Sequence, residues 1–409
     1  MRGLASNLAG LQQTRKLMDD VMRQAAGGMT RSMASPASPS RTALTRVSDF
    51  GSNPGNLGML TYVPEQLAPS PALVVVLHGC TQTPAAYNDG SGWSDLADSH
   101  GFVLLFPEQT AANNPKSCFS WFVPEDTARD SGEALSIKQM IDKAVADHGI
   151  DPSRIFVTGL SAGGAMASVM LATYPEIFAG GAIIAGLPYG AAGNVHQALN
   201  AMFQGQNRSA GEWGDLVRSA SRHRGTWPRI SIWHGATDHV VKPNNATELV
   251  KQWTDVHGLP AGPSERSSIG GHSREVWRDA SGEEIIESFG IAGMGHGTPL
   301  AVGEGDMEGG AAGAFMLDVG ISSSHHIAQF FGLAEGAEDR APVSRDVART
   351  PQPTARPDAL DGEIFPPGGE PKRAGAAFHP EAFGVPGSLP PQVLRVIENA
   401  FQAAGLVKR

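Results

Sequence analysis

The sequence predicts a three-layer α/β domain with a mostly parallel sheet over residues 49–333. Continuously apolar runs, such as residues 73–77, are typical of strands that are buried on both faces. These runs alternate with helical patterns along the chain, which implies right-handed βαβ crossovers between parallel strands. A Gly-x-Ser-x-Gly motif at residues 159–163 joins one such strand to a helical pattern of small residues.

The expected elements follow the hydrophobic pattern of the chain. Strands are expected at residues 59–63, 73–77, 102–106, 155–158, 181–185, 229–233, 274–278 and 284–289. The first is expected to be an edge strand that ends at Pro64, and Pro107 is expected to close the third. Helices are expected at residues 130–148, 162–173, 196–203, 244–257 and 322–331. Gly149 and Gly258 are the expected C-caps of two of these helices.

The composition changes at both ends of the chain. Within residues 1–48, a three-four spacing of apolar side chains predicts an amphipathic helix, which a flexible Ser/Pro/Ala-rich linker follows. This helix is expected to dock on its own domain, to dock on a second subunit and so form a homodimer, or to anchor at a membrane or granule surface. Residues 334–390 are rich in Pro, Gly and charge and are expected to be disordered. A short amphipathic helix is expected within residues 391–409.

Composition and charge argue against several classes of function. The formal net charge of −10 speaks against nucleic acid as a general partner. No apolar run approaches about 18 residues, so no transmembrane segment is expected. The N-terminus contains no apolar region long enough for a convincing signal peptide, which favours the cytoplasm. Two cysteines cannot form a zinc cluster, and neither a metal nor an organic cofactor is expected.

The Gly-x-Ser-x-Gly motif has the form of a nucleophile elbow centred on Ser161. A serine on a sharp strand-to-helix turn has a strained backbone, and the strand and the helix crowd both flanking positions. Only glycine fits there, which explains Gly159 and Gly163. The N-terminus of the following helix would stabilise negative charge that develops beside Ser161. Because the chain contains 50 glycines, an ordinary turn is the alternative interpretation of the isolated motif.

A serine nucleophile needs a general base and an acid that orients this base. In this architecture the three residues follow in the order Ser, Asp, His. Asp238 directly follows the sixth expected strand, at the same sheet edge as the elbow. His296 lies on a glycine-rich loop after the last strand, which can return over Ser161. Asp279 and Asp306 are the alternatives for the acid, and a loop-capping role is the alternative for His296.

An oxyanion hole should use two backbone N–H groups. One belongs to Ala162, the residue after the nucleophile. The other is expected on the loop that follows residues 73–77, where Gly79 lets the backbone approach the substrate closely. The amide of Cys80 is therefore the expected second donor.

Five motifs together resemble the polyhydroxybutyrate depolymerase family of esterases, whose carbohydrate-esterase relatives include feruloyl and acetylxylan esterases. They are His-Gly-Cys-Thr-Gln at 78–82, Cys-Phe-Ser-Trp-Phe at 118–122, Gly-Leu-Ser-Ala-Gly-Gly at 159–164, His-Gly-x-x-Asp at 234–238 and Gly-Met-Gly-His at 293–296. The resemblance covers roughly residues 50–333. It implies an α/β-hydrolase that acts on carboxylic esters and is often secreted, with Ser161, Asp238 and His296 as its triad.

The same resemblance implies roles for residues near the expected site. It implies a disulfide between Cys80 and Cys118, with two free buried thiols as the alternative in a reducing compartment. It also implies that Trp121 lines the acyl groove, although a plain core role is the alternative. Gln82, within the first motif, is a further expected substrate-binding residue.

A long stretch between Gly186 and Trp227 lies where hydrolases insert caps over their sites. Its apolar residues Met202, Phe203 and Trp213 either face an acyl group or pack the insertion.

The expected function is that of a serine ester hydrolase that cleaves 3-hydroxyalkanoate oligomer or polymer esters through an acyl-enzyme. Soluble oligomers and small esters are the favoured substrates, because neither a signal peptide nor a separate polymer-binding domain is recognisable in the sequence. The alternatives are a feruloyl- or acetylxylan-type carbohydrate esterase, a peptidase, or a hydrolase-fold binding protein without activity.

Overall fold

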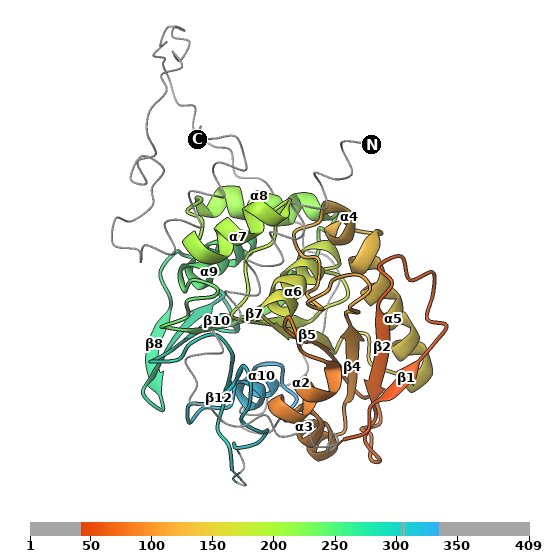
Figure 1. Ribbon diagram of the computed structural model, residues 1–409. Helices are drawn as coiled ribbons and strands as arrows, with labels where there is room; N and C mark the ends of the chain where they lie inside the picture. The colour runs from red at the N-terminus through yellow and green to blue at the C-terminus, as the bar shows by residue number, and fades with distance from the viewer. Residues whose placement is uncertain (1–41, 304, 306, 335–409) are drawn as a thin grey trace, which may run out of the picture. The chain divides into compact units, whose positions relative to one another are not determined.

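The computed structural model describes residues 42–303, 305 and 307–334 (Figure 1). The strands are β1 (Thr45–Val47), β2 (Gly58–Tyr62), β3 (Leu73–Leu77), β4 (Val103–Glu108), β5 (Ile155–Leu160), β6 (Gly180–Ile184), β7 (Arg229–Gly235), β8 (Glu265–Ile269), β9 (His272–Arg278), β10 (Glu284–Ile291), β11 (Thr298–Leu300) and β12 (Met316–Asp318). The helices are α2 (Pro84–Ser91), α3 (Trp93–His100), α4 (Pro124–Thr127), α5 (Gly132–His148), α6 (Ala162–Thr173), α7 (Val195–Gln204), α8 (Ala210–Ala220), α9 (Asn244–His257) and α10 (Ser323–Phe330).

The domain is built on a ten-stranded sheet with the order β1-β2-β4-β3-β5-β6-β7-β10-β9-β8. The central strands from β4 to β10 in this order are parallel. Antiparallel pairs extend the sheet at both ends, with β1 and β2 beside β4, and β9 and β8 beside β10. This arrangement confirms the predicted α/β-hydrolase fold with a mostly parallel sheet.

Helices cover both faces of the sheet and bury its side chains (Figure 1). Along β3, Leu73, Val75 and Leu77 pack in one core with α5, α6 and α9. Val74 and Val76 point to the other face and pack in a second core with α2, α3 and α10. All five side chains are fully buried, so each stabilises the fold by about 1.5–3 kcal/mol relative to exposure. The continuous apolar run at residues 73–77 therefore corresponds to a strand that is buried on both faces.

The strands β2 and β4 differ from the expectation in two details. The strand predicted at residues 59–63 is β2, but it is not an edge strand, because β1 pairs with it on the outer side. β1 begins four residues before Asp49 and carries no apolar pattern that would have revealed it. Pro107 lies inside β4 rather than after it. The residue is tolerated there because the pairing of β4 with β3 extends only to Leu105, which leaves one side of the strand without a ladder.

Most of the long elements agree with the hydrophobic pattern, whereas several other elements were not predicted. Gly149 and Gly258 are the C-caps of α5 and α9, with φ values of 61° and 67°. The unpredicted elements include α2, α3, α4, α8 and β8. In β8, residues 265–268 are exposed, and Arg266 forms an ion pair with Glu275 on β9 at 2.8 Å. A strand without a buried face gives no alternating pattern, so the sequence did not reveal it.

The terminal segments lie largely outside the described residues. The amphipathic helix and most of the linker expected within residues 1–48, the tail expected at 334–390 and the helix expected within 391–409 therefore stay predictions, as do the domain boundaries drawn from them. Within the described ranges, no helix is both long and apolar enough to cross a lipid bilayer.

Candidate active site

Ser161 occupies a strained turn between β5 and α6. Its backbone has φ 57° and ψ −115°, outside the conformations that side-chain-bearing residues ordinarily adopt. Such strain costs about 1–3 kcal/mol and persists only where surrounding structure enforces it. The Ser161 N–H donates to the Ile184 carbonyl at 2.9 Å, and its carbonyl accepts from Ala165 N at 2.8 Å. The turn is thus held from the neighbouring strand and from its own helix.

The flanking glycines are required by contacts with backbone atoms. A Cβ added to Gly159 would lie 2.5 Å from the Gly163 carbonyl carbon. A Cβ added to Gly163 would lie 2.2 Å from the Leu77 carbonyl oxygen and 2.6 Å from that of His78. Neither contact can be relieved by rotating a side chain. This is the crowding that the motif predicted.

Asp238 and His296 are brought together at one edge of the sheet. They lie on loops that follow β7 and β10, and these two strands are parallel neighbours. His296 Nδ1 donates to Asp238 Oδ2 at 2.7 Å. The second carboxylate oxygen, Oδ1, accepts from the N–H groups of Val240 and Val241 at 2.8 and 2.9 Å. With Nδ1 used in this way, the Nε2 atom of His296 is left to act on another group.

The Asp238 carboxylate is buried yet stays ionised. Burial by itself would raise its pKa, but the hydrogen bond from His296 and the nearby His234 imidazole outweigh burial and lower the pKa below its ordinary value. His234 Nε2 donates to the Val241 carbonyl at 2.8 Å and lies 3.5 Å from Asp238 Oδ2. His234 is therefore a second support of the carboxylate. In the sequence, His234 stands out only as the first residue of the His-Gly-x-x-Asp motif, four residues before Asp238.

Asp279, one of the two alternative acids, is engaged at a turn away from His296. Asp279 closes the turn between β9 and β10, where its Oδ1 accepts from Ser281 N at 2.8 Å and from Glu283 N at 3.0 Å. Asp306 lies outside the described residues.

The loops that carry Asp238 and His296 touch through their backbones. A Cβ at Gly235 would lie 2.3 Å from the Gly295 carbonyl oxygen, so this position must stay without a side chain. Thr237 donates to the Met294 carbonyl twice, from its N–H at 3.0 Å and from its hydroxyl at 2.9 Å. These contacts fix the distance between the loops that carry Asp238 and His296.

Two pockets meet at Ser161. The first, here called the cap pocket, encloses about 430 Å³ including the space at its open mouth. It is lined by Cys80, Cys118, Trp121, Phe122, Ser161, Ala162, Leu187, Val195, Ala198, Leu199, Met202 and Val241. The second, here called the Phe315 pocket, is lined by Gly79, Cys80, Gln82, Leu160, Ser161, His296 and Phe315. Ser161 and His296 thus face a common space, and Phe315, which the sequence analysis did not name, lines it as well.

Two backbone amides beside Ser161 are available to a ligand. On the loop after β3, Gly79 N donates to Gln82 Oε1 at 2.9 Å, and Thr81 N donates to the Lys116 carbonyl at 2.6 Å. Within the described part of the chain, the N–H groups of Cys80 and Ala162 have no hydrogen-bond partner. Both residues line the cap pocket with Ser161. These are the two amides that sequence reasoning named for an oxyanion hole.

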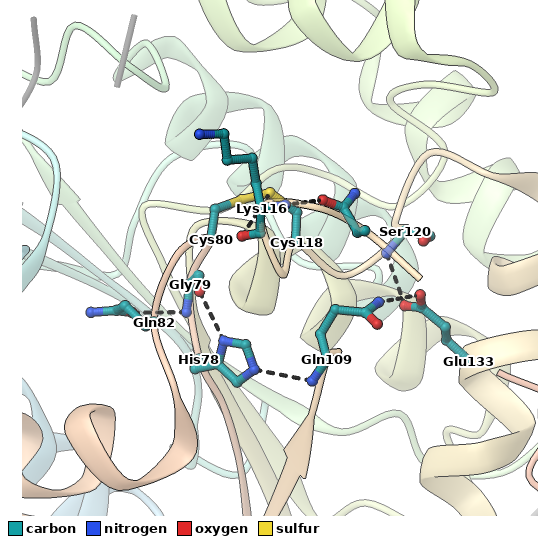
Figure 2. The surroundings of a disulfide bond; sticks show 10 residues. His78, Gly79, Cys80, Gln82, Gln109, Lys116, Cys118, Ser120 and Glu133 are labelled. Atoms are coloured by element: carbon teal, nitrogen blue, oxygen red, sulfur yellow. Dashed lines mark hydrogen bonds between the residues drawn. A yellow bond between two sulfur atoms is a disulfide. The ribbon is translucent and has the colours of Figure 1, made fainter. Parts of the chain in front are cut away.

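His78 anchors the loop that carries the Cys80 amide (Figure 2). Gln109 N donates to His78 Nε2 at 3.1 Å, so Nδ1 carries the proton and donates to the Gly79 carbonyl at 2.8 Å. The imidazole is almost fully buried, and this burial lowers its pKa, which keeps the ring neutral. The ring therefore ties the end of β3 to the end of β4.

A disulfide joins Cys80 to Cys118, as the family resemblance implied, and the free-thiol alternative is wrong (Figure 2). The segment beyond Cys118 is tied to α5 by Glu133, which accepts from Ser120 N at 2.8 Å and from Gln109 Nε2 at 2.5 Å. Burial raises the pKa of Glu133 to about 7, against the opposing effect of these hydrogen bonds. The loop with the Cys80 amide and the segment with Trp121 are thereby cross-linked.

The predicted cap is the region of α7 and α8. Helix α7 lines the cap pocket with four apolar residues, among them Met202, whereas Phe203 does not reach it. Trp213 is fully buried and donates from Nε1 to Glu248 Oε2 at 2.6 Å, so it packs the insertion. Trp121 and Phe122 line the pocket from the opposite segment.

Known esterases are similar to this chain in sequence and in structure. Residues 59–276 match the family described as esterase PHB depolymerase. Poly(3-hydroxyalkanoate) depolymerase C of Paucimonas lemoignei is 49% identical over 298 residues, which cover 73% of this chain and 72% of that protein. Acetylxylan esterase A of Emericella nidulans is 34% identical over 66% of this chain and 90% of its own length.

Among solved structures, the acetyl xylan esterase from Aspergillus awamori is similar, with a TM-score of 0.61 and 27% identity. The match covers 72% of this chain and 100% of that one. On this evidence the chain belongs to the PHB depolymerase family of esterases and is a carboxylic ester hydrolase with the α/β-hydrolase fold.

Proposed function

We propose that this chain is a serine esterase that cleaves oligomers of 3-hydroxyalkanoates, with Ser161, His296 and Asp238 as its catalytic residues. The observation that carries the proposal is the placement of a strained Ser161 in the same pocket as His296, whose other nitrogen is bonded to Asp238 at 2.7 Å. The substrate class is supported by the 49% identity to a poly(3-hydroxyalkanoate) depolymerase.

The mechanism follows from these positions. His296 accepts the Ser161 proton at Nε2 while Ser161 Oγ attacks the ester carbonyl carbon. Asp238 holds the proton on Nδ1 and stabilises the imidazolium that forms. The amides of Cys80 and Ala162 stabilise the oxyanion. His296 then protonates the departing alkoxide, the C–O bond breaks, and water activated by the same imidazole hydrolyses the acyl-enzyme.

The first test compares Ser161→Ala with the wild type on 3-hydroxybutyrate oligomers. We expect kcat/KM to fall by about a thousandfold or more, because the acyl-enzyme cannot form. Ser99→Ala, an exposed serine on α3, is the matched control and should keep full activity. If the Ser161→Ala variant retained the wild-type kcat/KM, the proposal would be wrong. Labelling by a fluorophosphonate probe would separately exclude an inactive binding protein.

Asp238→Asn tests whether the Asp238 carboxylate supports His296 during catalysis. The amide cannot support the imidazolium, and we expect kcat to fall by about 10³–10⁴-fold while substrate binding persists. Unchanged kcat would show that Asp238 only holds its loop.

The choice of substrate needs a panel, because the acetylxylan esterase relative aligns over 90% of its length. Hydroxybutyrate oligomers, methyl ferulate and acetylated xylan oligosaccharides should be compared by kcat/KM. The highest value is expected for the hydroxybutyrate oligomers. Preference for either of the others would assign the chain to the carbohydrate esterases instead.

A further inference from the structure

The two pockets beside Ser161 differ in their relation to the base. Both contain Cys80 and Ser161, but His296 lines only the Phe315 pocket. Ala162, whose amide would bind the oxyanion, lines only the cap pocket. A scissile ester at Ser161 must therefore place one of its halves beside His296 and the other half away from it.

The chemistry of acylation decides which half is which. The alcohol oxygen leaves only when it receives the proton carried by His296 Nε2, so the alcohol half must lie on the His296 side of Ser161. The acyl half then extends in the opposite direction. We propose that the leaving alcohol binds in the Phe315 pocket, through Phe315 and Gln82, and that the cap pocket holds the acyl chain. This inference rests on the proposed function of Ser161 and His296.

Gln82 presents a hydrogen-bond donor, rather than an acceptor, to the Phe315 pocket. Its side-chain oxygen accepts from Gly79 N at 2.9 Å, and this bond fixes the orientation of the amide (Figure 2). The amide nitrogen has no partner within the described residues, and the side chain is half-buried. The two N–H donors of this amide are thus available to an acceptor on the leaving alcohol.

The remainder of the Phe315 pocket is largely apolar. The Phe315 ring meets the His296 ring edge to face, with centroids 6.0 Å apart, and Leu160 lines the same space. An alcohol with a short alkyl branch and one carbonyl or carboxylate acceptor fits these features, as a 3-hydroxyacyl unit does. A sugar would bring several hydroxyl groups that the pocket does not match.

The position of Phe315 is fixed by the conformation and the contacts of its backbone. Its φ of 62° is unusual for an aromatic residue. Thr298 N donates to the Phe315 carbonyl at 2.8 Å, and a Cβ at Gly297 would lie 2.8 Å from that same oxygen. The loop that carries His296 and the turn before β12 are therefore fitted against each other, which sets the ring beside the imidazole.

The test uses four small esters that combine two acyl groups with two alcohols. They are the acetyl and butyryl esters of ethanol and of 3-hydroxybutyrate, and kcat/KM is measured for each. Phe315→Ala should lower the preference for the hydroxybutyrate alcohol over ethanol by about tenfold or more and leave the butyryl-to-acetyl ratio unchanged. Leu199→Ala, in the cap pocket, should change the acyl ratio and leave the alcohol ratio unchanged.

Uniform slowing of all four esters by Phe315→Ala would overturn the inference, because Phe315 would then only position His296. An altered acyl ratio in that variant would overturn it as well. If Phe315→Ala does not fold, Gln82→Glu serves instead, since its carboxylate still accepts from Gly79 N but offers no donor. Its alcohol ratio should also fall, and an unchanged ratio would contradict the inference.

Ser161→Ala is measured on the same four esters. If it is inactive while the ratios of the other variants do not move, only the assignment of the pockets fails. If it remains active, the proposed function itself fails.

Discussion

The elbow and the cap both border Ser161, but they are held by different kinds of contact. At the elbow, Gly159 and Gly163 leave room only for backbone atoms of neighbouring elements. The cap is held to α9 largely by side chains. Gln252, for example, accepts from Tyr189 N and donates to the Tyr189 carbonyl, both at 3.0 Å. A single substitution can replace one side-chain contact of the cap. No single substitution relieves the crowding of backbone atoms at the elbow. The backbone at Ser161 is thus held rigidly, whereas the contacts that hold the cap can change one residue at a time.

The largest effect is expected from Gly163→Ala, which places a methyl group against two carbonyl oxygens. We expect a loss of at least about 4 kcal/mol in the free energy of unfolding, measured by denaturant titration, or no soluble protein. Gly211→Ala, in cap helix α8, is the matched control, since its Cβ would meet nothing within 4 Å. That variant should gain about 0.5–1 kcal/mol. Equal effects at the two positions would contradict the comparison.

The second test removes the side chain that anchors the cap. Glu248 is buried and accepts from Trp213 Nε1, from Arg208 N at 3.1 Å and from Lys251 Nζ at 2.7 Å. Glu248→Ala leaves the buried Trp213 N–H and two part-buried donors unpaired, so we expect a loss of about 3–5 kcal/mol in the stability of the cap.

Hydrogen exchange measured by mass spectrometry checks this prediction. Residues 186–227 should lose protection, while β5 and α6 keep theirs. Glu248→Gln retains one acceptor and should show a smaller effect. Loss of protection at β5 as well would mean that the cap and the elbow form one cooperative unit.

The third test concerns pH and the segment at Cys118–Phe122, which is held by a disulfide and by Glu133. Because burial raises the Glu133 pKa in the folded state from 4.5 to about 7, the folded state binds the proton more tightly than the unfolded state. Its contribution to stability is fully present below about pH 4.5 and is lost as the pH rises through about 7.

Glu133→Gln cannot ionise and so lacks this dependence. The stability of the wild type relative to the variant should fall by at most about 3 kcal/mol between pH 4.5 and 7.5. Denaturant titrations of both proteins across this range provide the measurement. Parallel pH profiles would show that Glu133 keeps its ordinary pKa.

The smallest effect is expected at the start of α8. Ser209 and Glu212 form a reciprocal capping box, in which Glu212 N donates to Ser209 Oγ at 3.3 Å. Ser209→Ala should cost about 1 kcal/mol in thermal unfolding, and catalysis should be unchanged. Thr83→Ala, at the cap of α2, is the matched control outside the cap region and should cost a similar amount. A much larger loss at Ser209 would mean that the cap depends on this helix end.

Parts of the site were predictable because chemistry restricts backbone geometry within a few residues. The elbow needs its two glycines at set positions around Ser161, and parallel strands deliver Asp238 and His296 to one edge. Phe315 and Glu133 could not be found in this way. They reach the site through turns and long-range hydrogen bonds that leave no local periodicity. The role of Trp213 could not be predicted either, because it depends on how α8 packs on α9, and no short motif encodes that packing.

The exposed polar strand β8 has a consequence for the behaviour of the protein in concentrated solution. A ten-stranded sheet ends in backbone groups that another chain could pair with, and such an edge can seed aggregates. On β8, Glu265, Arg266, Ser267 and Ser268 are all exposed. A second strand docked here would have to strip water from two charged side chains. We therefore expect the polar residues of β8, which gave no apolar pattern in the sequence, to disfavour edge-to-edge association of the folded protein.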